Sequence, residues 1–150
     1  MSRTMKGVFR PRNPEKYKGD YTNILYRSSW ERMFMRWCDD NPNIKRWQSE
    51  ERAIWYDNPI TKRKARYFPD FIVEYERRDG IVVQEMVEIK PARQVEGPPV
   101  NPKRRTKAWA AACMTYAQNQ SKWKAARRWC EDRGMNFRIV TEKELGIMTK

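Results

Sequence analysis

The segment from Tyr67 to Lys90 constrains the fold of this chain more than any other. It holds two stretches rich in aromatic and β-branched residues, Tyr67–Tyr75 and Ile81–Lys90, separated by the turn-forming residues Arg78-Asp79-Gly80. This pattern predicts an antiparallel hairpin of two strands. Pro69 is compatible with it, because a proline near the start of a strand costs no ladder hydrogen bond.

The turn also predicts the register of this hairpin. If Arg77 pairs with Ile81 across a three-residue loop, Asp70 falls opposite Glu88, and Glu88 and Lys90 project from the same face. Opposed residues have Cβ atoms about 5 Å apart, so the two carboxylates can share one divalent cation. Mg²⁺ suits such oxygen ligands, and Lys90 is then placed to orient or deprotonate an attacking water.

The rest of the chain predicts a mixed α/β domain at residues 27–150. Residues 1–26 are basic and without periodicity, and we expect an extended arm laid over the domain or a partly disordered tail. The other expected elements are a helix from Ser28 or Ser29 to Cys38, a strand near Glu51–Tyr56, a basic loop or hairpin tip at Lys62–Arg66, a helix at Thr106–Asn119, a second helix capped by Ser121 and ending at Arg133, a strand at Asn136–Val140 and a terminal helix opened by Thr141-x-x-Glu144.

Composition limits the chemistry. The chain has 150 residues and a net charge of +13, so a polyanionic partner is expected, while its 19 aromatic residues (7 Trp, 7 Tyr and 5 Phe) require a packed fold. No histidine is present, which excludes His-based triads and His-containing zinc fingers. Cys38, Cys113 and Cys130 form no metal-binding pair, and we expect buried free thiols, a reducing compartment and no membrane span.

Basic residues flank the hairpin on both sides. Residues 61–66 carry four positive charges and residues 91–133 a net charge of +7, whereas residues 67–90 carry a net charge of −3. Because aromatic residues lie among the basic ones, binding of a phosphate backbone accounts for this better than a solvated surface does. The candidate nucleic-acid contacts are Lys62, Arg63, Lys64, Arg66, Lys103, Arg104, Arg105, Lys107, Lys122, Lys124, Arg127 and Arg128.

Glu31 is a further candidate acid, because the first helix can carry it over the sheet. Ser28-x-x-Glu31 is also a helix capping box, which is a purely structural explanation. Structural explanations exist as well for Asp70, as a turn former after Pro69, and for Glu88 with Lys90, as a surface pair on an exposed strand.

The motif Pro69-Asp70…Glu88-Ile89-Lys90, preceded by a helix with Glu31, resembles the PD-(D/E)xK nuclease superfamily. From about Tyr17 to Glu142 the chain is similar more specifically to the head completion nucleases of T-even-like tailed bacteriophages. That similarity lies in Tyr17-Lys18-Gly19-Asp20, Tyr26-Arg27-Ser28-Ser29-Trp30-Glu31, Trp47-Gln48-Ser49-Glu50, Arg66-Tyr67-Phe68-Pro69-Asp70-Phe71, Glu88-Ile89-Lys90-Pro91, Lys122-Trp123-Lys124-Ala125-Ala126 and Arg133-Gly134-x-x-Phe137-Arg138-Ile139.

The resemblance implies a restriction-endonuclease-like αβββαβ core, with a mixed central sheet flanked by helices, and a Mg²⁺-dependent deoxyribonuclease in which Mn²⁺ can substitute. Asp70, Glu88 and the backbone carbonyl of Ile89 would be metal ligands, Lys90 the catalytic lysine and Glu31 an accessory acidic ligand. The implied partners are double-stranded DNA and phage head, portal or neck proteins, and the implied location is the host cytoplasm during assembly or the virion.

Two other functions fit the same sequence. One is a non-catalytic DNA-binding protein that completes the head or plugs the portal. The other is a junction-resolving or transposase-type nuclease subunit on the same fold. An RNA-binding protein of ribosomal type explains the charge but leaves the paired carboxylates unexplained.

Overall fold

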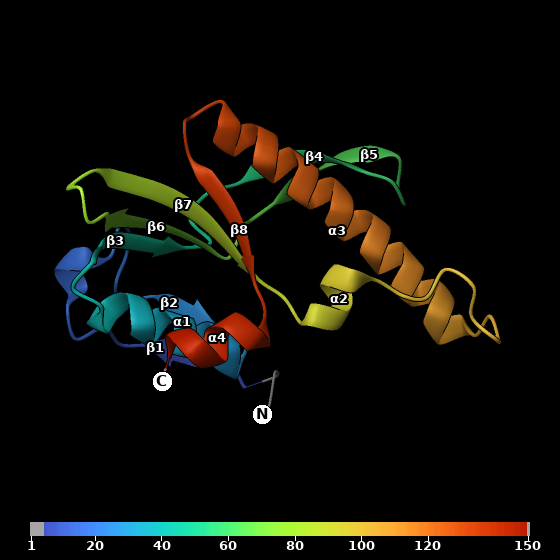
Figure 1. Ribbon diagram of the computed structural model, residues 1–150, viewed down its shortest axis with the longest axis horizontal. Helices are drawn as coiled ribbons and strands as arrows, with labels where there is room; N and C mark the ends of the chain where they lie inside the picture. Colours follow the sequence, from blue (N-terminus) through green and yellow to red (C-terminus); the bar gives the residue numbers. More distant parts are fainter. Residues whose placement is uncertain (1–4, 150) are drawn as a thin grey trace.

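A four-stranded mixed sheet forms the centre of the molecule (Figure 1). The computed structural model describes residues 5–149. The sheet has the order β3-β6-β7-β8, in which β7 and β8 run parallel and the other neighbours antiparallel. Its strands are β3 (Ile44–Ser49), β6 (Phe71–Glu76), β7 (Val82–Ile89) and β8 (Asn136–Val140).

The sheet is covered on both faces. The helices are α1 (Ser29–Asp40), α2 (Ala92–Glu96), α3 (Lys107–Glu131) and α4 (Glu142–Met148). In Figure 1, α1 and α4 lie on one side of the sheet and α3 on the other. With this arrangement the expected α/β class, with a mixed sheet between helices, is confirmed.

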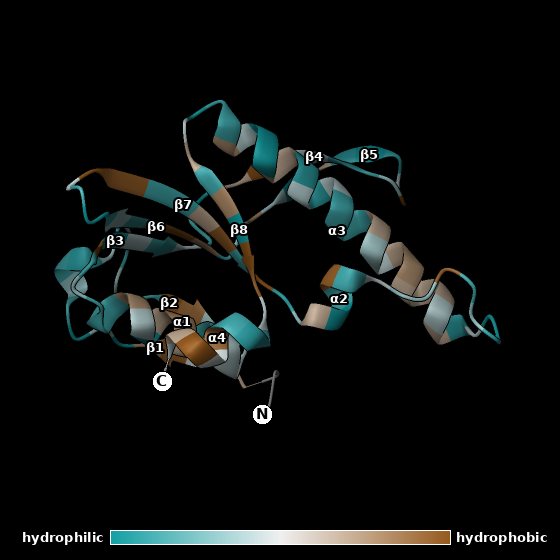
Figure 2. Cartoon of the chain, viewed as in Figure 1, coloured by the Kyte–Doolittle hydropathy of each residue, from teal (hydrophilic) through white to brown (hydrophobic). Residues whose placement is uncertain are grey.

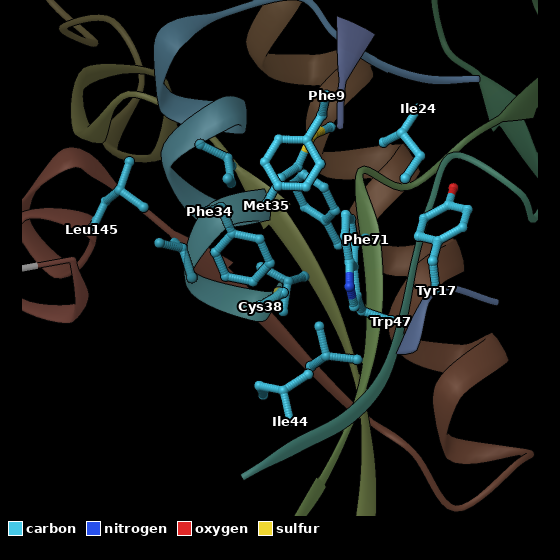
Figure 3. Close-up of a cluster of buried hydrophobic side chains, with 14 residues drawn as sticks. Phe9, Tyr17, Ile24, Phe34, Met35, Cys38, Ile44, Trp47, Phe71 and Leu145 are labelled. Atoms are coloured by element: carbon cyan, nitrogen blue, oxygen red, sulfur yellow. The ribbon is translucent and has the colours of Figure 1, made fainter. Parts of the chain in front are cut away.

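Alternation along β7 divides its side chains between two cores. Val87 and Ile89 join the larger cluster under α1, which Figure 3 draws in close-up, whereas Met86 belongs to the smaller cluster under α3. Glu88, two residues beyond Met86, therefore faces α3 as well. The prediction that Glu88 points away from Val87 and Ile89 is confirmed.

The larger core also takes in the N-terminal residues. Phe9 of β1 (Gly7–Phe9), Tyr17 and Ile24 of β2 (Ile24–Tyr26) are each at least 93% buried and pack with Trp47 (Figure 3). A 3₁₀ turn, η1 (Pro14–Lys16), connects the two short strands. Of the arm expected at residues 1–26, residues 5–26 are thus packed against the domain, and residues 1–4 lie outside the described part of the chain, as does Lys150 at the other end.

The end of α1 fixes this segment in place. The Lys16 ammonium group donates hydrogen bonds to the carbonyl oxygens of Cys38 (2.7 Å), Asp39 (3.0 Å) and Asn41 (2.8 Å). The buried Asp39 carboxylate in turn accepts from the backbone amides of Arg12 and Asn13. Since the last carbonyls of a helix lack partners of their own, these bonds stabilise both the helix end and the segment that supplies them.

A second hairpin stands off the main sheet, against α3. It is built from β4 (Ile54–Asn58) and β5 (Arg63–Tyr67), paired from Ile54↔Tyr67 to Asn58↔Arg63. The strand expected near Glu51–Tyr56 is thus shifted toward the C-terminus, to Ile54–Asn58. Of the basic loop or hairpin tip expected at Lys62–Arg66, all but Lys62 lies in β5. The strand expected to begin at Tyr67 begins at Phe71 instead, because Pro69 separates β5 from β6.

Three further elements differ from the sequence prediction. β3 was missed because an irregularity in its pairing between Ile44 and Arg46 disturbs the alternation of buried and exposed residues. The two helices expected around Ser121 are the single helix α3, because no Gly or Pro interrupts residues 107–131 and a serine caps only where the preceding chain is not helical. The short helix α2 was not expected either.

The polarity of the chain follows this layout. In Figure 2 hydrophobic and hydrophilic stretches follow one another along β7, whereas the C-terminal half of α3 is mostly hydrophilic. Cys38 and Cys130 are buried free thiols as expected, but Cys113 is only half-buried. No helix within residues 5–149 is both long and apolar enough to cross a membrane.

Candidate active site

Asp70 and Glu88 lie opposite each other where β6 begins and β7 ends. The ladder pairs Phe71 with Val87, so the next position places Asp70 across from Glu88. At the other end of the hairpin, the Arg77 amide donates to the Ile81 carbonyl over 2.8 Å. The register predicted from the Arg78-Asp79-Gly80 turn is therefore correct.

A backbone contact fixes the Asp70 carboxylate against β7. Its Oδ2 accepts a hydrogen bond from the Ile89 amide at 2.8 Å. Asp70 is half-buried, and desolvation of its carboxyl group, together with the charge of Glu31, raises the pKa of Asp70 to about 7. The Ile89 amide and Lys90 oppose the shift because both stabilise the ionised form.

Glu88 is 3% exposed and has a similar environment. Burial raises its pKa to about 7, while the positive charges of Lys90 and Lys122 lower it. The Tyr67 hydroxyl donates a hydrogen bond to Glu88 Oε2. Two carboxyl groups with raised pKa values on adjacent strands are typical of a functional site.

Glu31 caps α1 and also lies near the two carboxyl groups. Its backbone amide donates to Ser28 Oγ over 3.1 Å, which is the expected helix cap, but its carboxylate accepts from the Arg27 amide (3.4 Å). Burial raises the pKa of Glu31, and the charge of Glu31 in turn raises the pKa of both Asp70 and Glu88. The structure therefore brings Glu31 to the same site.

Lys90 follows directly after β7. Its amide donates to the Val140 carbonyl of β8 over 3.0 Å, so the edge of the sheet holds the backbone at this point. The Lys90 charge lowers the pKa of both Asp70 and Glu88, which places its side chain within electrostatic range of both carboxylates. All four predicted acidic and basic site residues thus converge.

The sequence patterns did not identify two other residues of this site. Glu50 has φ +53, donates its amide to the Asp70 carbonyl (3.1 Å) and forms an ion pair with Arg27. It follows β3, so the pairing of β3 with β6 would have placed it had that strand been recognised. Tyr67 is the last residue of β5. Side chains alternate between the two faces of a strand, and this alternation with Arg66 and Phe68 is the only sequence signal that the Tyr67 side chain points inward.

The predicted nucleic-acid contacts fall into three groups along the chain. All of them are exposed except Lys122. Lys122 is half-buried, and its ammonium group lies 5.6 Å from the centre of the Tyr67 ring and 5.8 Å from that of Tyr56. Because its charge acts on Glu88, Lys122 belongs to the active site as much as to the surface. The exposed members are Lys62, Arg63, Lys64 and Arg66 on the β4–β5 hairpin, Lys103, Arg104, Arg105 and Lys107 at the start of α3, and Lys124, Arg127 and Arg128 near its end.

The donor set fits a hard divalent cation. Among residues 5–149 no group of three or more His, Cys, Asp or Glu residues is arranged to hold a metal ion. Mg²⁺, however, needs only one or two carboxylates and fills its remaining positions with water, a carbonyl or substrate phosphate. Asp70, which is half-buried, and Glu88, which is buried, supply two adjacent carboxyl groups and meet that requirement.

Fold and site together define a class of nuclease. The family described as "TnsA-like endonuclease N terminal" matches residues 41–142, which contain Asp70, Glu88 and Lys90, and the chain belongs to that family. It is also 40% identical over 143 residues to the head completion nuclease of Enterobacteria phage T4, an alignment that spans 93% of this chain and 92% of that protein. The chain is thus a relative of the phage head completion nucleases, as its sequence motifs predicted. No solved structure matches it significantly.

Proposed function

We propose that this protein is a Mg²⁺-dependent deoxyribonuclease that hydrolyses phosphodiester bonds of DNA during phage head completion. The observation that carries the proposal is the convergence of Asp70, Glu88 and Lys90 at one end of the β6–β7 hairpin, in a chain that belongs to a nuclease family. The 40% identity to a head completion nuclease supports the stage at which it acts.

Each residue has a distinct role in this proposal. Asp70, Glu88 and the Ile89 carbonyl hold Mg²⁺, or Mn²⁺ in its place, and Glu31 adds an accessory acidic ligand. When bound, the cation polarises the phosphoryl oxygens of the substrate.

Lys90 positions the attacking water and offsets the negative charge that develops on phosphorus. The Tyr67 hydroxyl orients Glu88, since a group that donates to a metal-binding carboxylate fixes its rotamer. The charge of Lys122 acts on Glu88 and adds to the positive charge of the phosphate-binding region.

The exposed cations hold the double-stranded DNA without reading its sequence, since contacts between cations and phosphates carry no base information. A head completion role further requires contact with the filled head, its portal or the neck. We place this activity in the host cytoplasm during assembly, or on the virion.

Cleavage of supercoiled plasmid tests the proposal. The native chain should nick the plasmid with Mg²⁺ but not with EDTA, and Asp70→Asn and Lys90→Met should each lower the rate at least 100-fold, because the metal and the lysine act in the chemical step. Matched controls are Asp79→Asn and Lys45→Met, whose ion pairs with Arg77 and Glu76 lie at the opposite end of the same strands.

Full activity of Asp70→Asn would contradict the site assignment. An inactive Asp70→Asn protein that still completes heads would favour the non-catalytic plug considered above. Cleavage restricted to branched DNA would favour a junction-resolving enzyme instead.

A further inference from the structure

A cavity of about 460 Å³ lies between α2 and α3, beside the candidate active site and not part of it. Its walls include Gln94 and Gly97 from α2 and its end, and Ala112, Tyr116 and Asn119 from α3. The volume falls in the range of about 300–1,000 Å³ that is common for ligand pockets. We refer to it as the α2–α3 cleft.

One polar group in this cleft has no partner in the structure. Asn119 is only 4% exposed, and its Nδ2 makes no hydrogen bond with any residue from 5 to 149. A buried amide donor left without an acceptor costs free energy, so such groups are usually paired. Because Asn119 lines the cleft, a ligand there that presents an acceptor atom would satisfy it.

The other walls combine the Tyr116 ring with Pro98 and Pro99, and Arg93 and Thr115 also line the cleft. The ring of Tyr116 packs against Gly97, where φ is +84 and a Cβ atom would come within 2.7 Å of the ring. The loop after Gly97 is also fixed to the helix, since Trp109 Nε1 donates to the Pro99 carbonyl at 2.8 Å. A rigid aromatic wall, a proline wall and one amide are the features that hold an unstacked nucleobase by stacking and by a hydrogen bond to its edge.

The position of the cleft connects it to the carboxylates. Ala112, Tyr116, Asn119 and Trp123 follow one another on the same face of α3, and the Trp123 indole lies close enough to the Glu88 carboxyl group to lower its pKa. Asn119 and Trp123 are four positions apart, a rise of about 6 Å along the helix. The opposite wall, α2, begins two residues after Lys90.

We propose that the α2–α3 cleft is a subsite for one nucleobase, unstacked from a DNA strand whose backbone lies at Asp70 and Glu88. The preferred substrate is then DNA with an unpaired nucleotide at or near an end, because an unpaired base enters the cleft without the cost of opening a base pair. This inference rests on the proposed function, in that it takes DNA to be the substrate.

The test measures binding rather than cleavage. Fluorescence anisotropy in EDTA measures the affinity for two duplexes. One has a three-nucleotide single-stranded end, and the other has abasic residues at those three positions. Overhanging 3′ and 5′ ends are tested in turn. The native protein should bind the end that has bases about tenfold more tightly, as expected for one stacked and hydrogen-bonded base. Equal affinity for both ends would overturn the proposal and leave cleavage in Mg²⁺ unaffected.

Variants locate the effect. Ala112→Phe fills the cleft from an exposed helical position and should abolish the tenfold difference, as should Asn119→Leu, which removes the donor. Ala117→Phe is the matched control, because Ala117 is exposed on the same helix but does not line the cleft. If Ala112→Phe kept the native discrimination, the base would bind elsewhere and the assignment of this cleft would be wrong.

Failure of this inference is distinguishable from failure of the proposed function. A native protein that cleaves plasmid but does not discriminate between the two ends loses only the base subsite. A native protein that binds neither duplex and does not cleave plasmid in Mg²⁺ overturns both.

Discussion

The burial of Asp70 and Glu88 determines how the protein responds to pH. Each has a pKa of about 7 in the folded chain, against ordinary values of 3.8 and 4.5. The folded state therefore retains protons that the unfolded state has already released, and the metal-free protein should lose stability as the pH rises from about 4 to 7. Urea unfolding in EDTA across this range measures the effect.

Asp70→Asn should remove part of this pH dependence. An amide carries no charge to bury and still offers an oxygen to the Ile89 amide, so the variant should be more stable than the native chain at pH 8 in EDTA by at least about 1 kcal/mol. Asp57→Asn, at an exposed position, is the control and should behave as native. A variant no more stable than the native chain at pH 8 would show that the buried carboxylate is not the cause.

Tyr67 allows a test of how Glu88 is oriented. Tyr67→Phe removes the hydroxyl that donates to Glu88 and keeps the ring, so the Mg²⁺ concentration that gives half-maximal cleavage should rise roughly tenfold with little loss of stability. Tyr56→Phe is the matched control, because the Tyr56 hydroxyl accepts from Gln118 Nε2 of α3 instead of donating to Glu88. An unchanged Mg²⁺ requirement in Tyr67→Phe would contradict the orienting role.

At the scale of the elements, two serines that the sequence marks as helix N-caps lie at different places in their helices. Ser28 accepts from the Glu31 amide and caps α1, whereas Ser121 lies inside α3. Ser28→Ala should therefore cost about 1 kcal/mol of unfolding free energy, and Ser121→Ala should be neutral or slightly stabilising, since alanine is the better interior residue. Urea unfolding of the two variants checks this, and a larger loss for Ser121→Ala would mean that α3 is interrupted in solution.

The elements that the sequence predicted are those with local signals. The Arg78-Asp79-Gly80 turn determined the β6–β7 register, and with it the placement of Asp70 opposite Glu88. The missed strand β3 has no such signal, because its irregular pairing near Ile44 breaks the alternation and only its contact with β6 stabilises it. Glu50 was missed with it, since its approach to Asp70 is a tertiary contact and depends on that strand.

At the scale of the whole molecule, distant segments complete both the core and the site. Lys16 and Asp39 attach the N-terminal segment to the end of α1, a contact between residues more than 20 positions apart, and Phe9 and Tyr17 from this segment join the core. In the same way Glu31, Tyr67 and Lys122 come from three different elements to surround Asp70 and Glu88. Sequence patterns predict such elements separately but not the contacts between them.

Exposed cations lie at opposite ends of the molecule, and their contributions to DNA binding can be measured separately. Arg63 and Arg66 are exposed on the β4–β5 hairpin that supplies Tyr67 to the site, whereas Lys45 and Arg77, at the opposite end of the sheet, are paired with Glu76 and Asp79. If the DNA backbone lies along the hairpin, replacing Arg63 and Arg66 with serine should weaken binding to duplex DNA. The slope of log K against log salt should then fall by about two, close to 0.9 for each lost phosphate contact.

The matched control replaces Lys45 and Arg77 with serine, which removes the same formal charge and should leave the slope unchanged. Affinity measured between 50 and 200 mM salt in EDTA separates the two results, because a general charge effect would lower both variants equally. Equal loss in the two pairs would mean that DNA does not approach the active site along the β4–β5 hairpin. A loss confined to Arg63 and Arg66 would instead locate the bound backbone beside Tyr67, within reach of the two carboxylates.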